Sequence, residues 1–176
     1  MALTGLARPA RADVSGWASV TSGPTWLDEG TEQSWVESKG FELVPALSME
    51  TGMGSSPANA FIGGGLLHMQ TNFGRGTDLG VLGRVATQGF VLGRWGAALD
   101  LGGYARFWGV HSQGALGVLS LGAPWGLTLA ATGGFGTNEA RQFGVLLGVD
   151  FARMTVFRQS GEDWFPNPFP AYRAQR

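Results

Sequence analysis

Six charged residues are the strongest candidates for chemistry in this 176-residue chain. Each falls in an alternating stretch where every second residue is small or charged and the residues between are apolar. The six are Glu42, Glu50, Arg84, Asp100, Arg106 and Asp150. A period of two puts such residues on one face of β-strands. Asp100 and Arg106 lie six residues apart, so the pattern places a carboxylate and a guanidinium on the same side of one strand.

If these six residues lie inside a narrow barrel, their enclosure limits the roles that their charges can have. An isolated buried ion costs several kcal/mol, so enclosed charges must pair or remain hydrated. The simplest interpretation is a structural ion network that fills the interior. A polar conduit or a pocket for one small ligand is the alternative, because eight strands leave an interior just wide enough for side chains or one small molecule.

Catalytic, metal and cofactor motifs are not evident in the sequence. The two histidines, His68 and His111, are too few for a metal site without several carboxylates nearby. Adjacent strand residues point to opposite faces, so His111 cannot readily act as a base for Ser112. Gly63-Gly64-Gly65 lies inside a strand pattern with no Gly-Lys-Ser/Thr after it, which argues against a phosphate loop. We therefore expect no enzyme, no cofactor and no metal.

The composition points to an outer surface that does not face water. Only 14% of residues are charged, against about a quarter in typical soluble domains, and Lys39 is the single lysine. No run of 18 apolar residues exists, which excludes an ordinary transmembrane helix. A membrane β-barrel reconciles both facts, since only every second residue of its strands faces lipid. The net charge of −1, with no basic patch, gives no indication of nucleic-acid binding.

A repeated unit between residues 90 and 135 carries the clearest strand signal. Trp95-Gly96 and Trp125-Gly126 are thirty residues apart, and each pair opens an alternating run that ends in Gly-Gly-aromatic. This pattern predicts repeated hairpins whose two Trp-Gly turns lie at the same end of a barrel. The apolar phase gives the predicted lipid-facing positions Leu99, Leu101, Leu127, Leu129, Val145 and Leu147. Trp95, Trp108 and Trp125 fall at strand ends, where membrane barrels carry aromatic girdles.

The remaining elements complete about eight predicted strands. A first strand spans 14–21 and ends before Gly23-Pro24, and 25–34 is expected to be a loop. Strand 41–51 contains Pro45, which predicts a bulge, or an edge if the sheet is open. Residues 86–93 are either one strand with a bulge at Gly89 or a strand, a turn and a short strand. A turn at Ala152-Arg153 then leads into a last strand within 154–159.

The expected domain organisation has three parts. Residues 1–12 resemble the end of a signal peptide, because Ala10-Arg11-Ala12 has the small-x-small form of a cleavage site. A disordered N-terminal arm is the alternative for this segment. Residues 13–160 form the barrel. Residues 161–176, with three prolines, form a tail.

Residues 41–158 resemble the small outer-membrane β-barrel proteins of Gram-negative bacteria. The resemblance rests on the Trp-Gly turns, the GVLLGVDF alternation and the glycine-rich small-residue face. It implies an all-β, closed antiparallel up-and-down barrel in the bacterial outer membrane, in contact with membrane lipid and possible surface protein partners. The chain departs from that family at its end, because it finishes in Tyr172-Arg173-Ala174-Gln175-Arg176 rather than in an aromatic-terminated strand.

Three classes of function follow from the sequence. The first is a structural or surface-interaction barrel of the outer membrane. The second is a porin-like small-solute channel or ligand-carrying barrel. The third is a soluble secreted β-barrel that binds an apolar small molecule.

Overall fold

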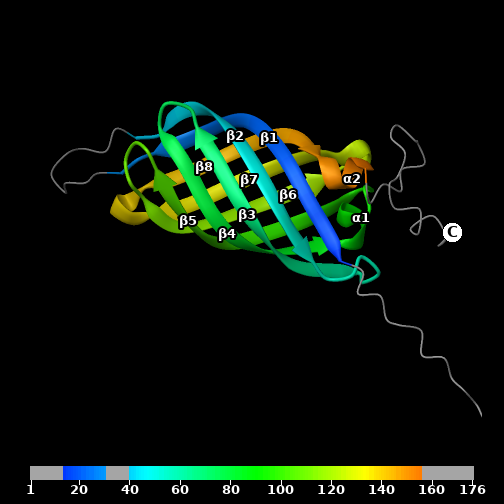
Figure 1. The fold of residues 1–176 in the computed structure, drawn as a ribbon. Coiled ribbons are helices and arrows are strands. Elements are labelled where there is room, and N and C mark those ends of the chain that lie inside the picture. Colours follow the sequence, from blue (N-terminus) through cyan, green and yellow to red (C-terminus); the bar gives the residue numbers. More distant parts are fainter. Residues whose placement is uncertain (1–13, 31–39, 156–176) are drawn as a thin grey trace, which may run out of the picture.

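Eight antiparallel strands close into an up-and-down barrel in the computed structural model, which describes residues 14–30 and 40–155 (Figure 1). The strands are β1 (Ser15–Asp28), β2 (Glu42–Gly54), β3 (Phe61–Asn72), β4 (Gly76–Thr87), β5 (Gly96–Phe107), β6 (Gln113–Gly122), β7 (Leu127–Gly136) and β8 (Arg141–Asp150). Each strand pairs with its neighbours in sequence, and β8 pairs with β1 to close the barrel. The predicted fold class is therefore confirmed. No helix in this part of the chain is long and apolar enough to cross a membrane.

The strand register sets the tilt of the barrel. A circuit of paired residues that leaves β1 at Thr25 crosses the other seven strands and returns to β1 at Ser15, ten residues away. A stagger of ten residues over eight strands tilts the strands by about 40° from the barrel axis, given the usual rise per residue and strand spacing. Side chains from distant parts of the chain therefore meet at one level of the interior.

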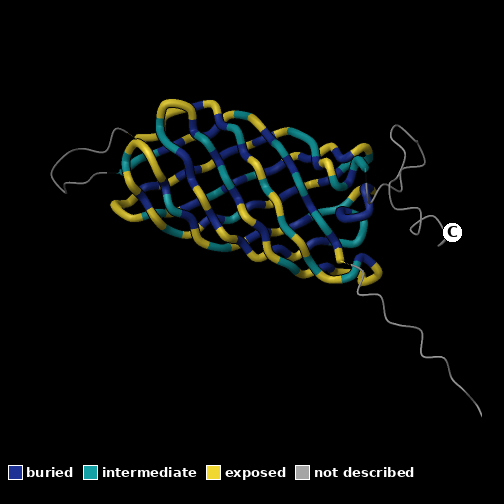
Figure 2. Tube along the Cα trace, viewed as in Figure 1, coloured by how far each residue is buried: buried dark blue, intermediate teal, exposed yellow. Residues whose placement is uncertain are grey.

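Burial alternates along every strand, as Figure 2 shows. In β4 the inward residues Leu82, Arg84 and Ala86 are buried, whereas the outward Val81 and Val85 are exposed. A one-residue slip would exchange these two sets, so the alternation fixes the register of each strand.

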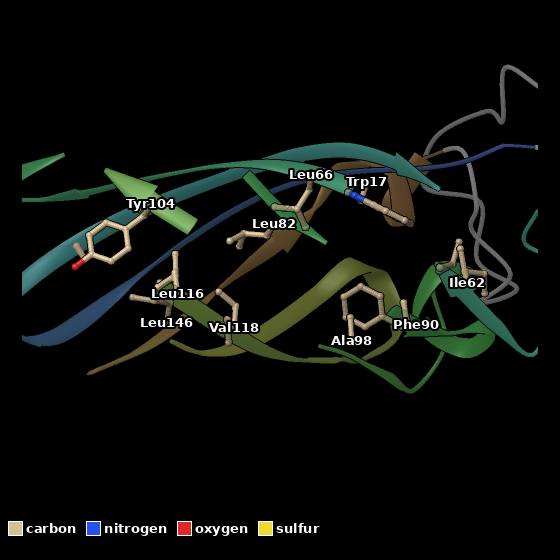
Figure 3. Close-up of a cluster of buried hydrophobic side chains, with 14 residues drawn as sticks. Trp17, Ile62, Leu66, Leu82, Phe90, Ala98, Tyr104, Leu116, Val118 and Leu146 are labelled. Carbon is tan, nitrogen blue, oxygen red and sulfur yellow. The ribbon is translucent and has the colours of Figure 1, made fainter. Parts of the chain in front are cut away.

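The middle of the interior is packed with aliphatic side chains. They are Leu66, Leu82, Leu116, Val118 and Leu146, each no more than 3% exposed. Figure 3 shows this apolar layer between Tyr104 on one side and Trp17 and Phe90 on the other. Side chains therefore fill the interior of the barrel at this level.

One end of the barrel is covered by two short helices, α1 (Gln88–Val91) and α2 (Phe151–Thr155) (Figure 1). The Thr87 hydroxyl caps α1 by accepting from the Phe90 amide at 3.4 Å, and Phe90 is buried against the interior. Residues 86–93 are thus a strand end and a helical turn, so both alternatives expected for this segment are wrong.

The predicted last strand is also wrong where it can be judged. The Asp150 carboxylate accepts from the Arg153 amide at 3.1 Å, which starts α2 directly after β8. Since β8 already pairs with β7 and β1, no free edge remains for a ninth strand. Residues 156–159 of that prediction, the signal-peptide segment 1–12 and the tail 161–176 lie outside the described residues.

The first strand is longer than predicted, because β1 continues through Gly23-Pro24 to Asp28. Pro24 lies opposite Pro45, and the pairing of β1 with β2 is uninterrupted there, so Pro45 marks neither a bulge nor an edge. The pairing of β1 with β8, in contrast, passes from Ser22–Leu147 to Thr25–Gly144 and omits Gly23 and Pro24.

The connections β4–β5 and β6–β7 lie at the same end of the barrel. The second contains a 3-10 turn, η1 (Pro124–Gly126), and β7 is followed at the opposite end by η2 (Thr137–Glu139). Arg153 donates from one nitrogen to the carbonyls of Arg94 and Ala123, which precede the two Trp-Gly turns. The two turns are therefore neighbours.

Candidate functional site

Arg84 is the centre of an ion cluster inside the barrel. It faces Asp100 across the β4–β5 pair and donates to both carboxylate oxygens, from Nε at 2.6 Å and from Nη2 at 2.7 Å. The same Nη2 donates to Glu50 Oε2 at 2.7 Å. The guanidinium carbon also lies 5.2 Å from the Trp17 ring centroid and 5.6 Å from that of Phe90. A two-pronged carboxylate contact with aromatic packing suits arginine and would not suit lysine.

Glu50 links this cluster to β3. Its Oε1 lies 3.1 Å from His68 Nδ1, and its Oε2 accepts from the Ser19 hydroxyl at 3.3 Å. His68 is 2% exposed, and its Nε2 has no partner among the described residues. Both oxygens of the Glu50 carboxylate are therefore bonded within the barrel.

A second ion cluster lies toward the other end of the barrel. Arg106 donates to both oxygens of Asp78, from Nε at 2.6 Å and from Nη2 at 2.8 Å, and to Gln142 Oε1 at 2.8 Å. Asn72 donates to Asp78 at 3.4 Å and accepts from Gln70 at 3.0 Å. Asp78 and Arg106 are register partners on β4 and β5, as Arg84 and Asp100 are.

Arg153 forms a third polar centre, at the end covered by α2. It donates to four acceptors, the Leu127 carbonyl, the Thr128 hydroxyl, the Arg94 carbonyl and the Ala123 carbonyl, at 2.9 to 3.2 Å. Its guanidinium carbon lies 4.5 Å from the Phe90 ring centroid. Burial lowers the pKa of this guanidinium, and the nearby Asp150 charge opposes the shift. Arg153 thus fastens α2 to two turns.

The predicted charged residues separate into distinct groups. Glu50, Arg84 and Asp100 meet in the first cluster, whereas Arg106 belongs to the second and Asp150 contacts the amide of Arg153. Asp100 and Arg106 both face inward, as expected, but the two side chains bond to other partners.

Glu42 departs from the predicted interior network. It is the first residue of β2, its side chain is 54% exposed, and it forms an ion pair with Arg75, which also lies 3.3 Å from Glu29. These contacts raise the Arg75 pKa, the hydrogen bond to Glu42 most of all. The alternation is correct, but the strand has already reached the barrel rim at this position.

Several interior partners are not among the residues that the sequence pattern singles out. They are Ser19, His68, Gln70, Asn72, Asp78, Gln142 and Arg153. Asp78 follows the turn-like sequence Gly74-Arg75-Gly76-Thr77, yet it is in phase with Gly80, Leu82 and Arg84 along β4. That phase is the signal that could have found it. Arg153 had no such signal, because its role depends on a helix at the end of the barrel.

The outer wall carries no charged side chain between the strand ends in the described residues. The outward-phase charged residues Asp28 and Arg141 stand at the last position of β1 and the first position of β8. The predicted lipid-facing residues all lie on this wall, with exposures from 36% for Val145 to 63% for Leu147. The others are Leu99, Leu101, Leu127 and Leu129.

Exposed aromatic side chains gather at the two ends of this wall. Toward one end lie Trp26, Phe41, Phe73, Phe107, Trp108, Phe135 and Phe143, and toward the other Phe61, Trp95, Trp125 and Phe151. The three predicted interfacial tryptophans, Trp95, Trp108 and Trp125, are among them and are 77%, 73% and 50% exposed. Between the two groups the exposed large side chains are Leu, Val and Met.

Hollows on the surface include one on the outer wall and one near the rim. A shallow groove of about 970 Å³ crosses the outer wall from β1 to β5, between two rows of outward side chains that include Leu67, Val81, Met49 and Leu79. A smaller hollow of about 350 Å³ lies where β5 meets β6, beside His111 and Ser112. There His111 Nδ1 lies 3.4 Å from the Arg106 carbonyl, and the Ser112 hydroxyl lies 3.3 Å from that of Tyr104. The two side chains thus have separate partners, and no carboxylate lines this hollow.

No group of three or more potential ligands that could hold a metal ion occurs in residues 14–30 and 40–155. Comparison with known proteins adds no functional assignment. No protein-family model matches the chain, and no curated protein or solved structure matches it either.

Proposed function

We propose that this chain is an integral β-barrel of the bacterial outer membrane with a structural or surface-interaction role. The observation that carries the proposal is the outer wall, which is apolar and uncharged between two groups of exposed aromatic residues while the charges lie inside. Lipid-facing barrels have this distribution, and a soluble barrel has the reverse.

The packed interior supports an anchoring role over a conducting one. Arg84 and Asp100 are paired at one level, Arg106 and Asp78 at another, and buried aliphatic side chains separate them. A water-filled path through the barrel would require the ion-paired and aliphatic side chains to move out of the interior. Contact with surface protein partners would then fall to the strand connections at the ends of the barrel.

A charge placed on the outer wall tests the membrane proposal. Leu101 is at the middle of β5 and 61% exposed, so Leu101→Arg should destabilise a membrane barrel by about 2 to 4 kcal/mol. In a soluble barrel the same exposed substitution should change stability by less than about 0.5 kcal/mol. Gln113→Arg, at the exposed first position of β6, is the matched control and should have little effect in either environment.

Folding into lipid vesicles, followed by urea titration and by heat-modifiable gel migration, measures both variants. A barrel that is soluble without detergent, and in which Leu101→Arg behaves like Gln113→Arg, would refute the membrane proposal. Planar-bilayer recordings address conduction separately. We expect no unitary conductance, and openings whose size changes with Arg84 or Arg106 substitutions would contradict the anchoring role.

A further inference from the structure

Two buried threonine hydroxyls face the same glycine beside the seam that closes the barrel. Thr25 on β1 and Thr132 on β7 are the register partners of Gly144, which lies between them on β8. Thr25 is 0% and Thr132 2% exposed, and neither hydroxyl has a partner among the described residues. A buried hydroxyl without a hydrogen bond costs about 1 to 3 kcal/mol, so two of them call for an explanation.

The geometry above Gly144 suits one small hydrogen-bonding ligand. A β-carbon added at Gly144 would lie 2.7 Å from Thr132 Oγ1, 2.8 Å from Thr25 Oγ1 and 3.5 Å from the Pro24 carbonyl oxygen. Both hydroxyls therefore point into the space in front of this glycine. No hydrogen bond joins the two hydroxyls to each other.

The strand pairing gives an independent reason for a ligand here. Pro24 has no amide hydrogen, and the β1–β8 pairs omit Gly23 and Pro24 just before Thr25–Gly144. The polar cradle thus adjoins the one break in the pairing of β1 with β8. Buried water commonly makes about three hydrogen bonds to polar groups that the protein itself leaves unsatisfied.

We propose that Gly144, Thr25, Thr132 and the Pro24 carbonyl form a binding site for a single structural water molecule that bridges β1, β7 and β8. The water accepts from or donates to the two hydroxyls and donates to the Pro24 carbonyl. Glycine at position 144 is required because a β-carbon there would lie 2.7 and 2.8 Å from the two hydroxyl oxygens and would obstruct the space that they face. The site is independent of the membrane proposal, since it needs only the barrel interior.

Water-to-protein NOE measurements on the full chain test the site, in whichever solvent or detergent keeps the chain folded. A long-lived water should contact the methyl groups of Thr25 and Thr132. Gly144→Ala should abolish these contacts, and Thr25→Val/Thr132→Val should remove the water while leaving the backbone unchanged. Thr25→Ser/Thr132→Ser keeps both hydroxyls and is the matched control, read from the backbone amide of Gly144.

A double-mutant cycle gives a second measurement. If one water joins the two hydroxyls, the unfolding constant of Thr25→Val/Thr132→Val should differ by about threefold or more from the value expected for independent changes. In the Gly144→Ala background this factor should fall to about one. The proposal is overturned if no long-lived water is found, if it persists in Gly144→Ala, or if the coupling occurs without the water. Should Gly144→Ala not fold, loss of the water in the double valine variant decides alone.

Discussion

Removal of Arg84 is the sharpest test of how the interior is held together. The guanidinium is 1% exposed and supplies three hydrogen bonds to two carboxylates, of which Asp100 is 0% and Glu50 9% exposed. In Arg84→Met, Glu50 keeps its contacts with His68 and Ser19, but Asp100 loses both bonds that its carboxylate receives from Arg84. The cost is dominated by that uncompensated carboxylate, and loss of one partner of a buried pair typically costs about 3 to 5 kcal/mol.

A second substitution separates the charge from the packing. Arg84→Met/Asp100→Leu removes both members of the pair and replaces them with apolar groups of similar volume. Such replacements are often neutral or stabilising, so the double variant should be clearly more stable than Arg84→Met alone. The matched control is Arg75→Met at the rim, where the side chain is 31% exposed and loss of the pair should cost less than about 1 kcal/mol.

Equilibrium urea unfolding of the full chain, monitored by near-ultraviolet circular dichroism, measures these three variants and the single variant Asp100→Leu under one condition. Equal midpoints for Arg84→Met and Arg75→Met would refute the view that Arg84 neutralises a buried carboxylate. A double variant as unstable as the sum of its single changes would show that packing, and not the unpaired charge, dominates.

Two further substitutions examine the apolar layer and the covered end of the barrel. Leu82→Ala should cost about 2 to 5 kcal/mol in the same urea assay, because Leu82 is 1% exposed and the surrounding strands limit collapse of the cavity; a cost below 1 kcal/mol would mean that the layer is loosely packed. Gly122→Ala would bring a methyl group within 2.6 Å of the Arg153 guanidinium, so it should destabilise the barrel by about 1 to 3 kcal/mol. The matched control is Gly133→Ala, whose methyl group would meet no atom within 4 Å and which should be close to neutral. Equal effects of the two alanines would contradict the role of Arg153 as a fastener.

The barrel could be predicted from the sequence because closure depends on local alternation. Inward and outward residues alternate along each strand, so each strand shows by itself which of its residues face the interior. The two helices could not be predicted in this way. Gln88–Val91 and Phe151–Thr155 are single turns whose stability comes from Phe90 and Arg153 packing against the barrel end, a contact between residues about sixty positions apart.

The sequence predicts which face of the strands the charged residues of the candidate site occupy, but not which of them contact each other. Alternation shows that Arg84, Asp100 and Arg106 share the inner face, yet it contains no information on which side chains meet. The register of the β4–β5 pair sets Arg84 opposite Asp100 and Asp78 opposite Arg106. The contacts of Arg84 with Glu50 and of Arg106 with Gln142 join strands that are not neighbours, so they depend on the ten-residue stagger of the closed barrel. A one-dimensional pattern cannot give this stagger, because it is a property of the closed circuit.

The interior charges also bear on how one register is selected. Buried ion pairs contribute little net stability, so stability alone does not explain why the core is not wholly aliphatic. Glycine and alanine occur on both faces of the strands. If the core were wholly apolar, a strand that slipped by one residue would therefore lose little free energy of packing. A slip of one residue in β4 or β5 would instead turn Asp78 and Arg84, or Asp100 and Arg106, onto the outer wall. In a membrane an exposed arginine costs about 2 to 4 kcal/mol at the midplane and about 0 to 1 kcal/mol near the interfaces. The cost would therefore be small for Arg106, which is one residue from the end of β5, and larger for Arg84, which is farther from the strand end. The ion clusters therefore give the correct register a lower free energy than a slipped one, even where the apolar pattern is ambiguous. This role requires ion pairs inside the barrel but no conduction through it.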